Sequence, residues 1–205
     1  MYLSRLILNP RSRQVSAELA NLYELHRTLM QAFPDGKDGP GPVLFRLEPD
    51  RRDKPPLLLV QSEAEPDWRH HRELSAYLLE EPRSKEVEIE VPPGKDLRFR
   101  LLANPTVCRD GKRQGLLDEE DQVEWLGRKG QRGGFSVDSV LPHAQRFVRS
   151  KKNGRTLTFY SVLFDGALTV ENPEAFRETL LSGIGRGKAF GLGLLSVAPA
   201  SGQGA

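Results

Sequence analysis

The chain is 205 residues long, which suits one large domain or two small ones of about 100 residues each. Hydrophobic residues make up 38% and charged residues 28%, an ordinary composition that can fill a core. The formal net charge of +2 is only mildly basic, so any basic surface must be local. The only cysteine, Cys108, excludes an intramolecular disulfide and a cysteine-rich zinc site. Because the sequence has no signal-peptide pattern and no run near the ~20 apolar residues of a membrane helix, we expect a cytoplasmic protein without a membrane partner.

The first half of the chain predicts the element order βαββαβ. A strand over residues 2–8 ends at Asn9-Pro10, because proline cannot extend a ladder of hydrogen bonds. A helix follows, with Asn21 as its expected N-cap and Glu24 placed to reach back to that cap, as in a capping box. The remaining elements are a hairpin, a weaker helical stretch and an edge strand, over residues 43–47, 57–61, 68–79 and 86–91.

The second half repeats this order after the turn signal Pro92-Pro93-Gly94. A strand over residues 97–103 ends in Asn104-Pro105, so the strand-end pattern of the first strand recurs about one small domain later. The other elements are a helix at 118–128, hairpin strands at 135–148 and 156–164 around Asn153-Gly154, a helix at 172–181 and a strand at 194–197. We therefore predict an α+β fold of two tandem ferredoxin-like (RRM-like) domains, residues 1–91 and 95–205.

Three segments could carry chemistry, and the first is the predicted helix around His26. Leucines at helical spacing are expected to form the buried stripe of this helix. Tyr23 and His26, three residues apart, then share a neighbouring face that Arg27 extends. Histidine is the side chain whose ordinary pKa lies near neutrality, so this group could move protons. The alternative is that His26 is an ordinary half-exposed helix residue and that Tyr23 serves packing.

The second segment is glycine-rich and runs from Gly183 to Gly193. Glycines let a backbone approach a phosphate closely, and Arg186 and Lys188 add positive charge. The spacing fits neither a Walker motif nor a dinucleotide-binding fingerprint. The alternative is a flexible connection between a helix and a strand.

The third segment is a basic hairpin with its turn at Asn153-Gly154. Its cations are Arg146, Arg149, Lys151, Lys152 and Arg155. Such a hairpin suits the backbone of a nucleic-acid duplex, although an ordinary solvated hairpin is an equal alternative. Because no histidine and carboxylate cluster has the spacing of metal ligands, we expect no catalytic metal and no cofactor.

With these segments the sequence resembles the CasE family, the CRISPR-RNA processing endoribonucleases of type I-E Cascade complexes. The matching motifs follow the family order over nearly the whole chain, and the family also has tandem ferredoxin-like domains. They are Met1-Tyr2-Leu3-Ser4, Tyr23-Glu24-Leu25-His26, residues 98–105, Val123-Glu124-Trp125-Leu126 and residues 183–196. The chain departs from the family pattern after Phe33.

The resemblance implies metal-independent cleavage at the 3′ base of a CRISPR repeat stem-loop. A 2′-hydroxyl attacks the adjacent phosphate, leaving a 2′,3′-cyclic phosphate and a 5′-hydroxyl, and the enzyme stays on its product as a Cascade subunit. It implies His26 as general base or acid, with Tyr23 assisting proton transfer. Lys152, or Lys151 as the fallback, would stabilise the charge on the phosphorane.

The resemblance also implies RNA contacts for several cations. These are Arg27, Arg149, Lys151, Arg155, Arg186 and Lys188. Two other functions stay open on the residues alone. The chain could be a non-catalytic subunit that binds hairpin RNA within a ribonucleoprotein complex, or a small-nucleotide enzyme that uses the glycine-rich segment.

Overall fold

The structure is a computed structural model that describes residues 1–33, 41–49, 54–70 and 74–200. The chain divides into two compact units. The first consists of Met1–Glu88, Arg149–Leu157 and Lys188–Gly191, and the second of Ile89–Val148, Thr158–Gly187 and the segment from Leu192 onward. Two short segments from late in the sequence therefore complete the first unit.

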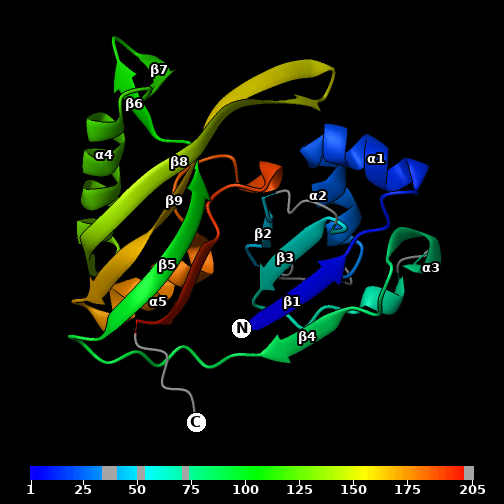
Figure 1. Cartoon of the computed structure of the whole chain (residues 1–205), viewed down its shortest axis with the longest axis horizontal. Helices are drawn as coiled ribbons and strands as arrows, with labels where there is room; N and C mark the ends of the chain where they lie inside the picture. The colour runs from blue at the N-terminus through cyan, green and yellow to red at the C-terminus, as the bar shows by residue number, and fades with distance from the viewer. Residues whose placement is uncertain (34–40, 50–53, 71–73, 201–205) are drawn as a thin grey trace. The chain divides into compact units, whose positions relative to one another are not determined.

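The first unit has a four-stranded antiparallel sheet in the order β2-β3-β1-β4. Its elements are β1 (Tyr2–Ile7), α1 (Arg13–Ala20), α2 (Leu22–Met30), β2 (Leu44–Leu47), β3 (Leu57–Ser62), the 3₁₀ helix η1 (Trp68–His70), α3 (Leu74–Tyr77) and β4 (Arg83–Glu86). β1 pairs with β3 on one side and with β4 on the other (Figure 1). Central first and third strands are the ferredoxin-like arrangement that the sequence predicts.

The core of this unit lies between the sheet and the two long helices. Leu25 of α2 and Val15 of α1 are fully buried against Leu58 and Phe45 of the sheet. Full burial of one such side chain contributes about 1.5–3 kcal/mol. The apolar stripe of α2 is therefore held against the sheet. This contact fixes the rotation of the helix about its axis, and with it the direction of the side chains beside the stripe.

In this unit the structure differs from the sequence prediction at three places. α1 was not predicted, and Ser12 begins it by accepting a hydrogen bond from the Val15 amide. The helix expected over 68–79 is two short pieces, η1 and α3, and residues 71–73 lie outside the described part. The strand expected at 86–91 is wrong, because β4 ends at Glu86. Its apolar residues Ile89 and Val91 pack instead against the core of the second unit.

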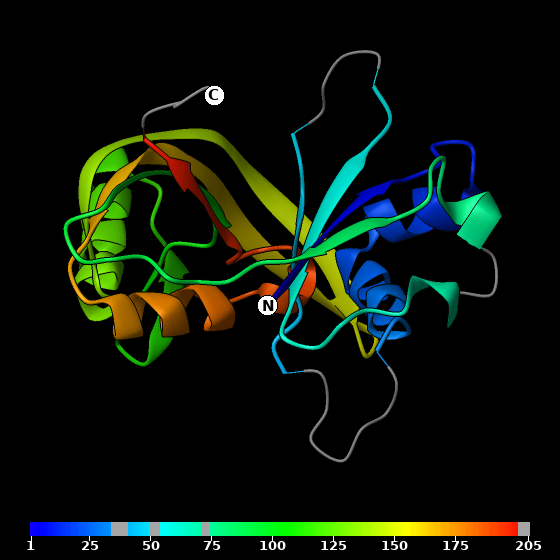
Figure 2. The same cartoon turned by 90° about the horizontal axis from the view of Figure 1, so that it is seen from below.

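The second unit repeats the topology, with the sheet order β10-β5-β9-β8. Its elements are β5 (Asp96–Ala103), β6 (Thr106–Arg109), β7 (Lys112–Gly115), α4 (Glu119–Arg132), β8 (Phe135–Lys152), β9 (Arg155–Val170), α5 (Pro173–Ser182) and β10 (Leu195–Pro199). The second 3₁₀ helix, η2 (Lys188–Phe190), falls in the first unit. α4 and α5 cover one face of this sheet through Trp125 and Phe176 (Figure 2). The predicted α+β fold of two ferredoxin-like units is confirmed.

The β8–β9 hairpin turns where the sequence predicts. Asn153 and Gly154 both have positive φ, 50° and 73°, as a two-residue hairpin turn requires. The two strands are much longer than the runs of apolar residues suggested. As a result the hairpin tip, Arg149–Leu157, belongs to the first unit, although the strands begin in the second. In the described part of the chain no helix combines the length and apolar character needed to cross a membrane.

Candidate catalytic site

The site begins with Tyr23 and His26 on one flank of α2. The buried stripe of α2 is made by Leu25, Thr28 and Leu29. Tyr23 and His26 lie beside it and are half-buried, with their ring centroids 6.5 Å apart. The face that the spacing predicts for these two side chains is therefore the face they share in the structure.

His26 stacks on a buried aromatic side chain. Its ring stacks on Phe45, a fully buried residue of β2, at 6.1 Å between centroids and 13° between planes. Gly191 approaches the same phenyl ring so closely that a Cβ there would lie 3.0 Å from Phe45 Cε2. The His26 Nδ1 atom is buried and has no hydrogen-bond partner among the described residues. The accessible part of the imidazole therefore lies away from Nδ1.

Burial and the nearby charge of Lys152 both lower the pKa of His26, with burial the larger cause. The imidazole is then predominantly neutral at pH 7. A neutral imidazole can accept a proton from a hydroxyl, which is the property that a general base needs.

Lys152 comes to this face from the tip of the β8–β9 hairpin. Its Nζ lies 4.9 Å from the centroid of the Tyr23 ring, within the range of a cation–π contact. Tyr23 also stacks on Phe190 of η2, at 5.7 Å and 29°. A phenol, an imidazole and an ammonium group therefore meet on one surface of the first unit.

The N-terminus of α2 differs from the predicted capping box. Asn21 makes no side-chain cap bond to its own helix, and Glu24 pairs instead with Arg27 at 2.9 Å. The Asn21 Oδ1 atom accepts hydrogen bonds from Ser150 Oγ, at 2.5 Å, and from the Lys151 amide, at 2.9 Å. The capping box is therefore wrong, because residues distant in sequence use the cap side chain.

The predicted RNA-contacting cations fall into two groups. Those in the first unit are Arg27, Arg149, Lys151 and Arg155, whose side chains are exposed, and the half-buried Lys188. Arg186 is exposed and belongs to the second unit. Along the glycine-rich segment five glycines have positive φ: Gly183, Gly185, Gly187, Gly191 and Gly193. The backbone there uses conformations that glycine adopts most readily.

Sequence reasoning missed several residues of this site. Phe45 and Phe190 supply its aromatic contacts, and Ser150 its link to α2. Outside this site, the small β6–β7 hairpin of the second unit exposes Arg109, Lys112 and Arg113. The dipeptide Asp110-Gly111 is a recognised hairpin signal and could have revealed this second basic hairpin.

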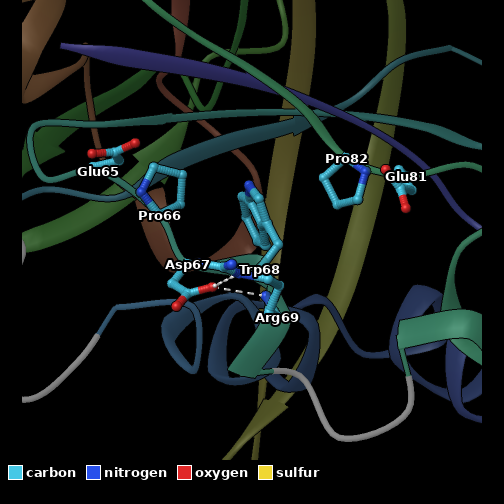
Figure 3. Close-up of a pocket in the computed structure, with 7 residues that line it drawn as sticks. All are labelled: Glu65, Pro66, Asp67, Trp68, Arg69, Glu81 and Pro82. Carbon is cyan, nitrogen blue, oxygen red and sulfur yellow. Dashed lines mark hydrogen bonds and ion pairs between the residues drawn. The ribbon is translucent and has the colours of Figure 1, made fainter.

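A separate hollow of 520 Å³ in the first unit has a different chemistry (Figure 3). It is lined by Glu65, Pro66, Asp67, Trp68, Arg69, Glu81 and Pro82. The lining contains three carboxylates and one cation, and that cation, Arg69, bonds Asp67 at 3.2 Å. Such a lining repels phosphates, so this hollow is distinct from the surface around His26. Within the described residues no three histidine, cysteine or carboxylate side chains are grouped to hold a metal ion.

Comparison with known proteins places the chain in a family. Residues 1–199 match the family model described as CRISPR associated protein. The chain is 42% identical to the CRISPR-associated endoribonuclease Cse3 of Thermus thermophilus, over 97% of this chain and 100% of that protein. It is 31% identical to the CRISPR system Cascade subunit CasE of Escherichia coli, with the same coverage.

The fold agrees with these relatives. A solved structure of the CRISPR endoribonuclease Cse3 bound to a 19-nucleotide RNA superimposes with a TM-score of 0.90 and 40% identity, covering 97% of this chain and 100% of that one. Both the sequence and the arrangement of elements therefore match over nearly their full lengths. The chain belongs to the CasE/Cse3 family of CRISPR-associated endoribonucleases.

Proposed function

We propose that the protein cleaves CRISPR precursor RNA at the 3′ base of the repeat stem-loop without a metal ion. The products would carry 2′,3′-cyclic phosphate and 5′-hydroxyl ends, and the protein would remain on its product as a Cascade subunit. The endoribonuclease and Cascade names of its relatives support this proposal. The observation that carries it is the meeting of His26, Tyr23 and Lys152 on one surface, from segments far apart in sequence.

In the proposed reaction the 2′-oxygen of the nucleotide before the cut forms a bond to the adjacent phosphorus, and the bond from phosphorus to the 5′-oxygen breaks. His26, kept neutral by its lowered pKa, is suited to take the proton of the 2′-hydroxyl. The leaving 5′-oxygen must gain a proton, and Tyr23 lies beside His26 to assist that transfer. Positioned proton transfer typically contributes about 10²–10⁴-fold to the rate.

Lys152 supplies the electrostatic part of the proposal. Its ammonium group lies over the Tyr23 ring and close enough to His26 to lower the pKa of the imidazole. A charge at this place would stabilise the extra negative charge of the phosphorane more than that of the ground-state phosphate. Lys151 is the weaker candidate, because its main-chain amide is bonded to Asn21 and strand alternation directs its side chain to the face opposite that of Lys152.

Six cations, five of them exposed and one half-buried, would hold the RNA in register. Contacts to phosphates orient a nucleic acid without reading its sequence. We assign this role to the six residues of the predicted set, Arg27, Arg149, Lys151, Arg155, Arg186 and Lys188. Correct placement of the 2′-oxygen opposite the leaving oxygen then supplies the remaining acceleration.

A cleavage assay with a repeat stem-loop in EDTA tests the proposal. The unmodified protein should cut, whereas His26→Ala should bind the RNA normally and cut at least about 10²-fold more slowly. His143→Ala is the matched control, because His143 lies in the second unit and bonds Asp165. Unchanged cutting by His26→Ala would remove His26 from the mechanism.

The same assay separates the alternative functions. A non-catalytic hairpin-binding subunit would bind the stem-loop and leave it intact at every protein concentration. A small-nucleotide enzyme would bind mononucleotides, and a titration without RNA would detect this. The match to relatives named as endoribonucleases over the full chain favours cleavage over both.

A further inference from the structure

The N-terminus of α2 is hydrogen-bonded to the tip of the β8–β9 hairpin, and its own cap residue makes no side-chain bond within the helix. An asparagine at an N-cap usually accepts a hydrogen bond from an amide in the first turn of its own helix. Asn21 instead accepts from Ser150 Oγ and from the Lys151 amide. In return, Ser150 Oγ accepts a hydrogen bond from the Tyr23 amide at 3.3 Å. Ser150, a residue of β8, thus caps the N-terminus of α2.

Burial sets Ser150 apart from its neighbours on the hairpin. Its side chain is only 3% exposed, whereas every other residue from Arg149 to Leu157 is exposed. The hairpin tip is therefore a solvated structure attached to α2 at one buried point. We call these three hydrogen bonds, which involve Asn21, Ser150, Lys151 and Tyr23, the Asn21–Ser150 clasp.

The spacing on both sides of the clasp brings the proposed catalytic groups together. Side chains two residues apart on a strand point to the same face, so Lys152 follows Ser150 toward α2. Tyr23 is two residues after Asn21, at the start of the helix, and His26 is nearly one turn further on. The clasp consequently determines which lysine of the hairpin meets the tyrosine.

We propose that Asn21 and Ser150 are positioning residues that attach the hairpin tip to α2 and thereby hold Lys152 beside Tyr23 and His26. The catalytic part of this inference rests on the proposed function. Its physical part, the placement of the Lys152 charge next to His26, is independent of RNA. The two parts can therefore fail separately.

The physical part is tested by following the imidazole of His26 by NMR as the pH is varied, without RNA. Lys152→Ala should raise the pKa of His26, because it removes a positive neighbour. Asn21→Ala and Ser150→Ala should raise it in the same direction, since the lysine is no longer held. In the Lys152→Ala background Asn21→Ala should add little, because the two changes act through one charge.

A matched control separates positioning from ordinary stability. Asn172 caps α5 in the second unit with its own side chain, accepting from the Ala175 amide. Asn172→Ala should lower the denaturant midpoint of unfolding, as loss of an N-cap does, and leave the titration of His26 unchanged. A His26 titration that moves in Lys152→Ala but not in Asn21→Ala or Ser150→Ala would overturn the clasp.

Single-turnover cleavage tests the catalytic part. Asn21→Ala and Ser150→Ala should each slow cleavage by roughly 10–10²-fold, as expected from a misplaced group, with RNA affinity nearly unchanged. In the Lys152→Ala background Asn21→Ala should have little further effect on the rate. If the unmodified protein does not cleave, the proposed function fails while the NMR result still decides the clasp. Full cleavage by both clasp variants would overturn their role as positioning residues.

Discussion

The Nζ atom of Lys152 lies 4.9 Å from the centre of the Tyr23 ring, and the charge it carries lowers the pKa of His26. An exposed cation–π contact contributes only about 0.5–1 kcal/mol. The contact therefore favours this position of the ammonium group and leaves the group in contact with solvent. The lysine therefore has a defined place and remains exposed. One residue of a distant hairpin thus connects to both proposed proton-transfer groups of α2.

Replacing Lys152 by alanine should slow single-turnover cleavage by about 10²–10³-fold. Removal of one group that stabilises transition-state charge typically has this cost. Lys151→Ala is the matched comparison, because alanine keeps the amide that bonds Asn21 and removes only an exposed side chain. It should lower RNA affinity modestly and leave the cleavage rate within a few-fold. Equal rate losses in the two variants would contradict the assignment of Lys152.

The cleavage rate should fall on the acid side of a pH profile with a midpoint below 6.5, the ordinary pKa of histidine. A general base must be unprotonated, and the lowered pKa keeps His26 neutral to a lower pH. In Lys152→Ala this midpoint should move to higher pH as the pKa of His26 rises. A rate that instead falls as the pH is raised through the same range would assign His26 as the acid.

The same shift contributes to the pH dependence of stability. In the unfolded chain His26 binds a proton at a higher pH than in the folded protein, so this group favours folding above pH 6.5. That contribution is lost as the pH falls from 6.5 through the lowered folded-state pKa. Denaturant unfolding at several pH values should show a smaller loss over this window in His26→Ala than in the unmodified protein.

Much of the fold follows from patterns within the sequence. Alternating apolar residues and the Asn153-Gly154 turn locate the strands. Each βαββαβ half then permits few sheet orders, because crossover connections are right-handed. The strand expected at 86–91 failed because alternation reports only that Ile89 and Val91 face apolar surroundings. It does not distinguish a strand paired in a sheet from an unpaired segment that packs on a core.

The site was predictable only where its residues are neighbours in sequence. Tyr23 and His26 share a face because of their spacing on one helix. The ring that stacks on His26 belongs to Phe45, and the residue that caps α2 is Ser150. Both contacts join residues distant in sequence and depend on tertiary packing. Strand alternation separates Lys151 from Lys152, but the contact with Asn21 decides which of them faces the helix. The local capping rule failed at this same contact.

RNA affinity should depend steeply on salt, because the proposed binding surface is built mainly from exposed cations. If about five of them meet phosphates, the slope of log K against log salt should be roughly −3.5 to −4.5. This corresponds to about 10²–10³-fold weaker binding at 200 mM than at 50 mM salt. Arg149→Ala should reduce the slope by about 0.7–0.9, while Arg128→Ala, on the exposed side of α4, serves as the control. A flat salt response would exclude the hairpin as the RNA-binding surface.

Gly191→Ala should disturb the position of His26 through Phe45. Gly191 has φ of +76°, and an added Cβ would press on Phe45, the ring that supports His26. Gly94→Ala is a close control, because Gly94 has φ of +75° and nothing within 4 Å of the added carbon. Left-handed backbone strain of about 1–2 kcal/mol is common to both variants. Gly191→Ala should therefore unfold at lower denaturant concentration than Gly94→Ala and lose cleavage activity, because His26 stacks on the ring that the added carbon displaces. Equal stability and equal cleavage in the two variants would show that Phe45 does not transmit the position of Gly191 to His26.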